Sequence, residues 1–168
     1  DLLENSQLSR WHFLIGSPGN GKSAAVGKLY QKLKENNIVF KSRDKDIYSS
    51  NSKTLPYILE AYEGDENYSF AFFAQDASVV ENPYADEISP AKEMLGLIRE
   101  AWLKRKCLII CANRGIIEEA SRIMDESEEF KNEKWLKKIF ACLGKPQSTI
   151  LDFDINSRYK GNCTQLKF

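Results

Sequence analysis

The stretch HFLIGSPGNGKS, His12 to Ser23, decides the fold of this chain. It begins with a short apolar run, and Gly16, Gly19 and Gly21 then follow within six positions. Beyond it, apolar side chains recur at helical spacing with lysines between them, at Val26, Leu29, Tyr30 and Leu33. This order predicts a strand, a glycine-rich turn and an amphipathic helix that ends at Asn36 and Asn37.

The turn GSPGNGKS, Gly16 to Ser23, fits the pattern G-x-x-x-x-G-K-[ST] in full. Glycines allow backbone N–H groups to converge on a phosphate without β-carbons in the way. We expect Lys22 to meet the β- and γ-phosphates and Ser23 to offer its hydroxyl to Mg²⁺, while the positive end of the helix faces the same anion. A glycine-rich turn without a ligand is the alternative. The residues assigned to nucleotide binding are Gly16, Ser17, Pro18, Gly19, Asn20, Gly21, Lys22, Ser23 and Ala24.

Four more apolar runs predict strands, at residues 38 to 40, 70 to 76, 108 to 111 and 149 to 155. Apolar periodicity predicts a helix after Ser89 and Pro90, another around residues 116 to 124, and a last one that stops at Gly144. Residues 44 to 68 are polar and predict at most one short helix. Strands that alternate with helices indicate an α/β fold. We expect a three-layer α/β/α sandwich with a mainly parallel five-stranded sheet.

Two further stretches follow the loop in chain order, FAFFAQD at Phe70 to Asp76 and LIICANRG at Leu108 to Gly115. Together with GSPGNGKS, they make residues 12 to about 155 resemble P-loop NTPases of the additional-strand group, which includes the AAA+ ATPases. The resemblance implies ATP and Mg²⁺ as cofactors, Asp76 as a magnesium ligand and Asn113 as the sensor of the γ-phosphate. A narrower likeness, carried by GSPGNGKS, an Asp-Ala-Ser stretch and ANRGII, is to ATPases of phage-defence systems linked to DNA phosphorothioation.

Asp76 and Asn113 each have a simpler interpretation. Asp76 could be a polar strand end without a ligand. We favour the metal role because its strand should neighbour the loop strand, at the edge where open α/β sheets bind ligands. Asn113 also belongs to Asn-Arg-Gly, which forms good turns.

The pattern lacks the residue that would activate water in AAA+ relatives. AAA+ relatives carry a glutamate directly after the metal-binding aspartate, whereas this chain has Ala77. Glu81 is the first candidate for a carboxylate, and Gln75 or Asp76 itself could orient the water instead. Without a well-placed base, assistance worth about 10²–10⁴ in rate is missing. The sequence therefore predicts slow turnover.

AAA+ rings supply an arginine to the γ-phosphate of a neighbouring subunit, and Arg114 and Arg122 are the candidates here. Glu118 and Arg122 are four residues apart, so an exposed helix pair is the simpler interpretation of Arg122. A cluster of lysines around Trp135 predicts the solvated face of a helix rather than a nucleic-acid patch, at Lys131, Lys134, Lys137 and Lys138. We assign no catalytic role to the lone His12.

The composition is that of one globular domain, residues 1–168, with a formal net charge of zero. No overall field attracts nucleic acid or an anionic membrane, so such a partner would need a local patch. No apolar run reaches the length of about 20 residues that crosses a bilayer, and we expect a cytoplasmic protein with free thiols. On a strand, Cys107 and Cys111 would lie about 13 Å apart, too far for a disulfide. We expect a core domain from a longer protein, without the helical lid of AAA+ proteins.

ATP is favoured over GTP because the chain lacks an N-K-x-D guanine-reading motif. The leading hypothesis is a Mg-ATP-binding ATPase module that acts with protein partners or further copies of itself, with nucleic acid left open as a partner. The first alternative is a nucleotide-gated switch with little hydrolysis. The second is a small-molecule kinase, which ranks last because residues 120 to 145 contain only Arg122 for an arginine-rich lid.

Overall fold

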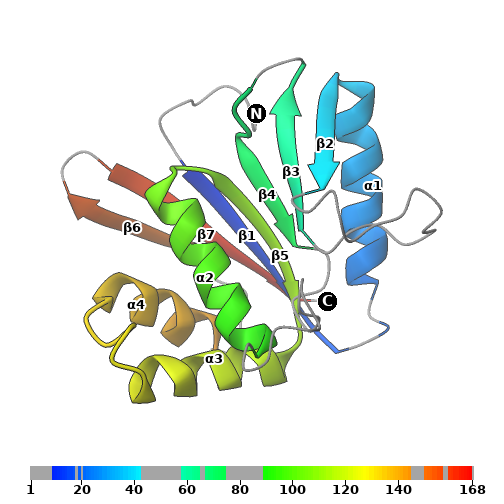
Figure 1. Cartoon of the computed structure of the whole chain (residues 1–168). Helices are drawn as coiled ribbons and strands as arrows, with labels where there is room; N and C mark the ends of the chain where they lie inside the picture. Colours follow the sequence, from blue (N-terminus) through cyan, green and yellow to red (C-terminus); the bar gives the residue numbers. More distant parts are fainter. Residues whose placement is uncertain are drawn as a thin grey trace.

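A computed structural model describes residues 9–17, 19, 21–42, 58–64, 67–74, 89–144, 150–156 and 159–167. These residues form a seven-stranded sheet in the order β2-β3-β4-β5-β1-β7-β6 (Figure 1). The strands are β1 (Ser9–Ile15), β2 (Ile38–Ser42), β3 (Ile58–Glu63), β4 (Ala71–Ala74), β5 (Cys107–Ala112), β6 (Ile150–Asn156) and β7 (Tyr159–Lys167). The helices of the same described part are α1 (Lys22–Glu35), α2 (Pro90–Leu103), α3 (Arg114–Glu126) and α4 (Lys134–Leu143).

The centre of the sheet is parallel and its flanks are antiparallel. Strand β5 pairs in parallel with β4 and β1, and β1 pairs in parallel with β7. The pairs β2–β3, β3–β4 and β6–β7 are antiparallel. The expected α/β class is confirmed, but the sheet is mixed rather than mainly parallel.

Strands β3 and β7 add to the five strands that the sequence predicted. Strand β3, with the sequence ILEAYE, falls in the region where we expected at most a short helix. Glu and Ala favour helices locally, and pairing with β2 and β4 on both sides overrides that preference. Strand β7 contains Gly161 and Asn162, which are poor strand formers, and it is held between β1 and β6. Pairing with neighbouring strands, and not local preference, therefore makes both segments strands.

Helices cover both faces of the sheet, with α1 on one face and α2, α3 and α4 on the other (Figure 1). Along each central strand, successive side chains point to opposite faces. In β1, Phe13 contributes to the core under α2, α3 and α4, and Leu14 contributes to the core under α1. In β4, Phe72 likewise contributes to the core under α2, α3 and α4, and Phe73 contributes to the core under α1. The central strands are therefore apolar on both faces.

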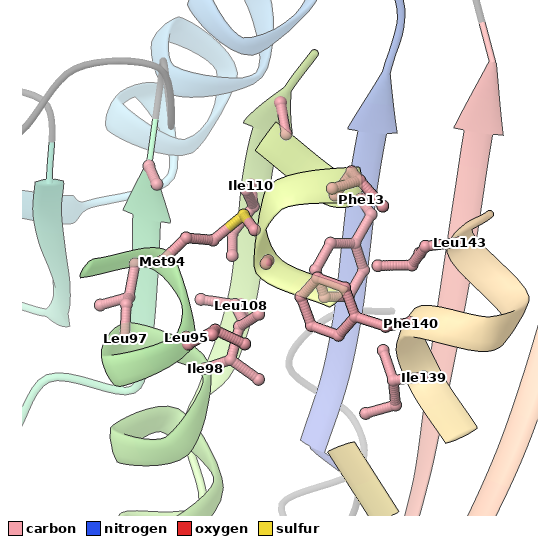
Figure 2. Close-up of a cluster of buried hydrophobic side chains, with 14 of the residues drawn as sticks. Phe13, Met94, Leu95, Leu97, Ile98, Leu108, Ile110, Ile139, Phe140 and Leu143 are labelled. Atoms are coloured by element: carbon pink, nitrogen blue, oxygen red, sulfur yellow. The ribbon is translucent and has the colours of Figure 1, made fainter. Parts of the chain in front are cut away.

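The larger core lies between the sheet and α2 and α4 (Figure 2). Figure 2 shows Leu95 and Ile98 of α2 and Ile139 and Phe140 of α4 turned toward Phe13 and its strand neighbours. Each of these side chains is at most 2% exposed. Because so much apolar surface is removed from water, this core holds the helices on that face in place.

The helix ends follow the local signals in the sequence. Ser89 caps α2 by accepting a hydrogen bond from the Lys92 amide at 3.2 Å, and Pro90 occupies the first turn. Helix α1 ends at Glu35 with Asn36 as its C-cap, and Asn37 has a left-handed backbone with φ of 61°. These boundaries agree with the sequence prediction.

Among the described residues, the cysteines Cys107, Cys111 and Cys142 are not joined in disulfides, and the first two lie on the α1 side of β5. His12 lies inside β1. Among the described helices, none combines the length and the apolar character needed to cross a membrane.

Phe72 offers a direct test of the core, because its side chain is fully buried in β4. The Phe72→Ala substitution should lower the free energy of unfolding by about 3–5 kcal/mol, since it removes a large buried ring and leaves a cavity. Urea denaturation measures this change. Tyr68→Ala is the matched control, because Tyr68 is 85% exposed and surface changes usually stay within about 0.5 kcal/mol. Equal losses in the two variants would contradict this packing.

Candidate functional site

The glycine-rich loop connects the carboxyl end of β1 to the start of α1 (Figure 1). Gly19 and Gly21 have left-handed backbones with φ of 82° and 76°. An L-residue in that conformation costs about 1–2 kcal/mol, which explains glycine at both positions. Pro18 and Asn20 lie outside the described residues, as does the side chain of Ser23.

The Lys22 side chain turns back over the loop. Its Nζ donates hydrogen bonds to the Gly16 carbonyl at 2.8 Å and to the Ser17 carbonyl at 2.7 Å. These two bonds hold an ammonium group beside the carboxyl end of β1. Lys22, whose positive charge is held at the start of the loop, is only partly buried.

The first turn of α1 has amide groups that no hydrogen bond within the helix uses. Gly21 is the N-cap and provides no side-chain hydrogen bond, whereas Ser89 and Asn113 cap α2 and α3. The Ala25 amide already donates to the Gly21 carbonyl at 2.9 Å. The preceding amides have no partner within the helix, and the helix dipole adds positive potential there. Helix α4 also lacks a side-chain cap, so the distinctive feature of α1 is the combination with the loop and Lys22.

Asn113 lies next to the loop because β1 and β5 are paired. Ile15 is in register with Ala112, and the Gly16 amide donates to the Ala112 carbonyl at 3.3 Å. The Asn113 side-chain oxygen Oδ1 accepts the Ile116 amide at 2.9 Å and so caps α3. Asn-Arg-Gly is therefore the start of a helix, because Asn113 is the N-cap and Arg114 and Gly115 belong to α3, and not the turn that the sequence offered as the simpler interpretation. A capping oxygen leaves the amide nitrogen Nδ2 as a donor, so the same side chain could also meet a phosphate.

Strand β4 ends its described part at Ala74, in register with Ile110 of β5. The expectation that this strand neighbours the loop strand is wrong, because β5 pairs with both β1 and β4. All three strands are parallel, so their carboxyl ends still lie at one edge of the sheet. Asp76, Gln75, Ala77 and Glu81 lie outside the described residues. The magnesium and water-activating roles assigned to them remain predictions.

The arginine candidates are both exposed. Arg114 is the first residue of α3, directly after Asn113. Arg122 forms an ion pair with Glu126 at 2.7 Å on the exposed face of α3. The simpler interpretation of Arg122 as a helix pair is confirmed, although its partner is Glu126 and not Glu118.

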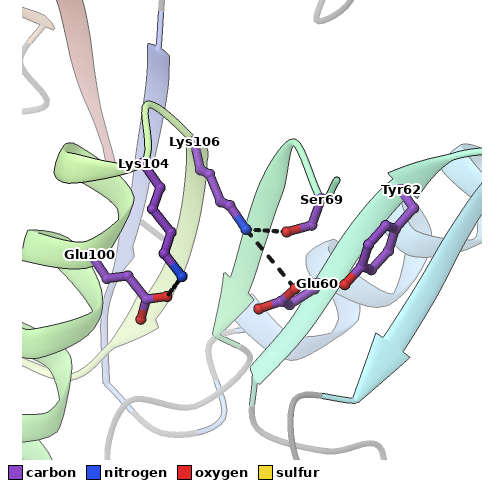
Figure 3. Close-up of polar contacts among 6 residues, drawn as sticks. All are labelled: Glu60, Tyr62, Ser69, Glu100, Lys104 and Lys106. Carbon is purple, nitrogen blue, oxygen red and sulfur yellow. Dashed lines mark hydrogen bonds and ion pairs between the residues drawn. The ribbon is translucent and has the colours of Figure 1, made fainter. Parts of the chain in front are cut away.

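The sequence did not predict a polar cluster at the opposite end of β4 and β5 (Figure 3). Figure 3 shows the Lys106 ammonium between the Ser69 hydroxyl, to which it donates a hydrogen bond, and Glu60. Lys106 Nζ lies 4.0 Å from Glu60 Oε2 and 4.4 Å from the centre of the Phe72 ring. Tyr62 donates to the same Glu60 oxygen at 2.7 Å.

This hydrogen bond to Glu60, together with burial and the Glu60 charge, raises the pKa of Tyr62 above its usual value. Tyr62 is therefore a poor base near neutral pH. The cluster pairs one ammonium with one carboxylate, which gives a balanced structural contact rather than a reactive group. Glu60 and Tyr62 lie on β3, whereas Ser69 precedes β4 and Lys106 precedes β5. Because Lys106 is distant from the other three residues in the sequence, no local motif could have predicted the cluster.

Within the described ranges, no three His, Cys, Asp or Glu side chains lie together in a group that could hold a metal ion. Comparison of the chain with protein-family models, with curated proteins and with solved structures gives no match.

The cap on α3 can be measured. Asn113→Ala removes the oxygen that accepts the Ile116 amide, and it should lower the free energy of unfolding by about 1 kcal/mol. Asn113→Asp keeps a capping oxygen and should cost much less. Chemical denaturation compares the two.

Asn132→Ala serves as the matched control, because Asn132 is exposed and lies outside the helices. A loss from Asn132→Ala as large as that from Asn113→Ala would argue against the cap.

Proposed function

We propose that this chain is a Mg-ATP-binding P-loop ATPase module that couples nucleotide binding or hydrolysis to a larger assembly. The observation that carries the proposal is the Lys22 ammonium, held by the Gly16 and Ser17 carbonyls inside a loop that leads into an uncapped helix. A fixed cation, glycines with left-handed backbones and free helix amides are the groups that bind a phosphate chain. The sequence pattern of the loop agrees with this chemistry.

The order of the strands gives further support. Strand β5 lies between the loop strand β1 and the strand β4, after which Asp76 follows in the sequence. An inserted strand between these two agrees with the resemblance to the additional-strand group. The carboxyl ends of β1 and β5 bring the loop and Asn113 to one edge. We assign the γ-phosphate contact to Asn113 on this basis.

Different residues would bind the phosphates, hold Mg²⁺ and activate water. Lys22 and the amides of the loop would bind the phosphates, and Ser23 with Asp76 would hold Mg²⁺. The bound Mg²⁺ would neutralise charge on the phosphates and orient them. Asn113 would donate from Nδ2 to the γ-phosphate. Glu81 is our first candidate for the base that takes a proton from the attacking water.

A second candidate function is a nucleotide-gated switch with little hydrolysis. It is favoured because Asn113 would have two roles at once. The same side chain that would meet the γ-phosphate also caps α3. Loss of the γ-phosphate would therefore act directly on the first turn of a helix at the molecular surface. Ala77, in place of the glutamate found in AAA+ relatives, points in the same direction.

Substitution of Lys22 tests nucleotide binding. Lys22→Ala removes the cation that meets the phosphates, and it should weaken Mg-ATP binding about ten- to hundredfold, as expected for one hydrogen bond to a charged group. Isothermal titration calorimetry provides the dissociation constant. Lys28→Ala, an exposed lysine of the same helix, should bind like the wild type. Unchanged affinity in Lys22→Ala would defeat the proposal.

Single-turnover hydrolysis separates the ATPase from the switch. If Glu81 is the general base, Glu81→Ala should slow hydrolysis by about 10²–10⁴, and Ala77→Glu should raise the rate by restoring a carboxylate after Asp76. Quenched-flow sampling of phosphate release measures both.

Tight binding with negligible turnover in the wild type would select the switch. Ready turnover that Glu81→Ala does not change would remove Glu81 from its role.

A further inference from the structure

Gly115, the second residue of α3, is a glycine that the backbone conformation does not require. It lies inside the helix and is exposed. Its backbone does not have the positive φ angle found at Gly19, Gly21 and Gly64. Glycine inside a helix is less favourable than alanine, because it loses more conformational freedom on folding. The missing side chain at position 115 therefore calls for an explanation outside the backbone.

The other glycines inside the described helices have different surroundings. A β-carbon added to Gly27 of α1 or to Gly96 of α2 would meet no other atom within 4 Å. A β-carbon at Gly115 would lie 3.3 Å from Oδ1 of Asn113, closer than such carbons normally come to a neighbouring atom. Of these three glycines, Gly115 is thus the one whose missing side chain leaves room for a neighbour.

The neighbour of Gly115 is the atom that caps α3. Oδ1 of Asn113 accepts the Ile116 amide at 2.9 Å, so this oxygen is held at the first turn of the helix. A methyl group at position 115 would press on the oxygen, and a hydrogen bond weakens when its acceptor moves out of line. Gly115 therefore provides the space in which Asn113 can cap the helix.

The position of Oδ1 also determines the position of the other end of the Asn113 side chain. The oxygen and the NH₂ group of a carboxamide share one carbon atom, so a rotation that displaces Oδ1 also displaces Nδ2. Nδ2 is the one donor atom of an asparagine side chain. The γ-phosphate contact that we assign to Asn113 uses this atom. It therefore depends on where Oδ1 is held.

Asn113 follows the residue that joins β5 to the glycine-rich loop. The Ala112 carbonyl accepts the Gly16 amide at 3.3 Å, and the Gly16 carbonyl accepts a hydrogen bond from Lys22 Nζ at 2.8 Å. Two hydrogen bonds thus connect the Lys22 ammonium to the residue before Asn113. The Asn113 side chain starts beside the loop that would hold the phosphates.

We propose that Gly115 is a positioning residue through which the site distinguishes ATP from ADP, an inference that rests on the proposed nucleotide function. Without a side chain at position 115, Asn113 caps α3 through Oδ1 and offers Nδ2 to the γ-phosphate. An alanine there shifts Oδ1 and, with it, Nδ2, so the γ-phosphate loses part of its contact. ADP has no γ-phosphate, and its affinity does not depend on Gly115.

The affinities for two nucleotides test this role. The probes are Mg-ADP and the Mg²⁺ complex of an ATP analogue with a non-hydrolysable imido bridge between the β- and γ-phosphates, each titrated in a calorimeter. Gly115→Ala should bind the analogue about tenfold more weakly, as expected for a weakened hydrogen bond to a charged group. It should bind Mg-ADP like the wild type. Gly96→Ala, the matched control on α2, should leave both affinities unchanged.

The Asn113→Ala background shows whether the effect passes through Asn113. This background lacks both Oδ1 and Nδ2, so the addition of Gly115→Ala should cause no further loss of affinity for the analogue. Urea midpoints give a readout without nucleotide. Gly96→Ala should raise the midpoint, because alanine restricts the unfolded chain and meets no atom in the helix. Gly115→Ala should raise it only in the Asn113→Ala background.

Failure of this inference and failure of the proposed function give different results. If neither nucleotide binds to the wild-type chain, the proposed function fails, and the role of Gly115 fails with it. If both bind and Gly115→Ala keeps the wild-type ratio of the two affinities, the nucleotide function stands and the role of Gly115 is overturned. An equal loss of analogue affinity with and without Asn113 would also overturn it. So would a urea midpoint that Gly115→Ala raises as much as Gly96→Ala does.

Discussion

The parallel pairing of β1 with β5 is the constraint on which the rest of the structure depends. It places Ile15 beside Ala112 and joins the Gly16 amide to the Ala112 carbonyl. The glycine-rich loop and Asn113 therefore emerge next to each other from neighbouring strands. Because β5 also pairs with β4, the same strand aligns the carboxyl end of β4 with this edge. A shift of β5 by one residue would exchange its two faces and disrupt both cores.

Local signals in the sequence predicted two kinds of element. These are the strands that are covered on both faces and the helix that begins with a strong cap. The apolar runs that form β1, β4 and β5 could be recognised as strands without tertiary information. Ser89 followed by Pro90 predicted the start of α2. Strand β3 was missed because Glu60 and Tyr62 lie on a face that is only partly covered, and a half-covered strand rich in Glu and Ala has no clear period. Strand β7 was missed because its pairing with β1 and β6 decides its structure.

Only part of the candidate site could be located from the sequence, because only local features can be recognised there. A glycine-rich loop is a local feature, so its residues could be recognised in the sequence and found between β1 and α1. Asn113 was identified from its place after an apolar strand, but its bond to the Ile116 amide depends on how α3 begins. Asp76 and Glu81 lie outside the described residues, and their roles stay predictions. The space that Gly115 leaves for the Asn113 oxygen depends on the same geometry, and no sequence pattern shows such a contact.

The central claim is that the loop amides bind a phosphate chain, and selective ¹⁵N-glycine labelling tests it most directly. The chain has nine glycines, and their amide signals can be followed while Mg-ATP is added. The account predicts that Gly16, Gly19 and Gly21 shift strongly, while Gly64 and Gly144, which lie outside the loop and α1, stay in place. Large shifts at Gly64 or Gly144 with none at the loop, or no shift at any glycine, would contradict it.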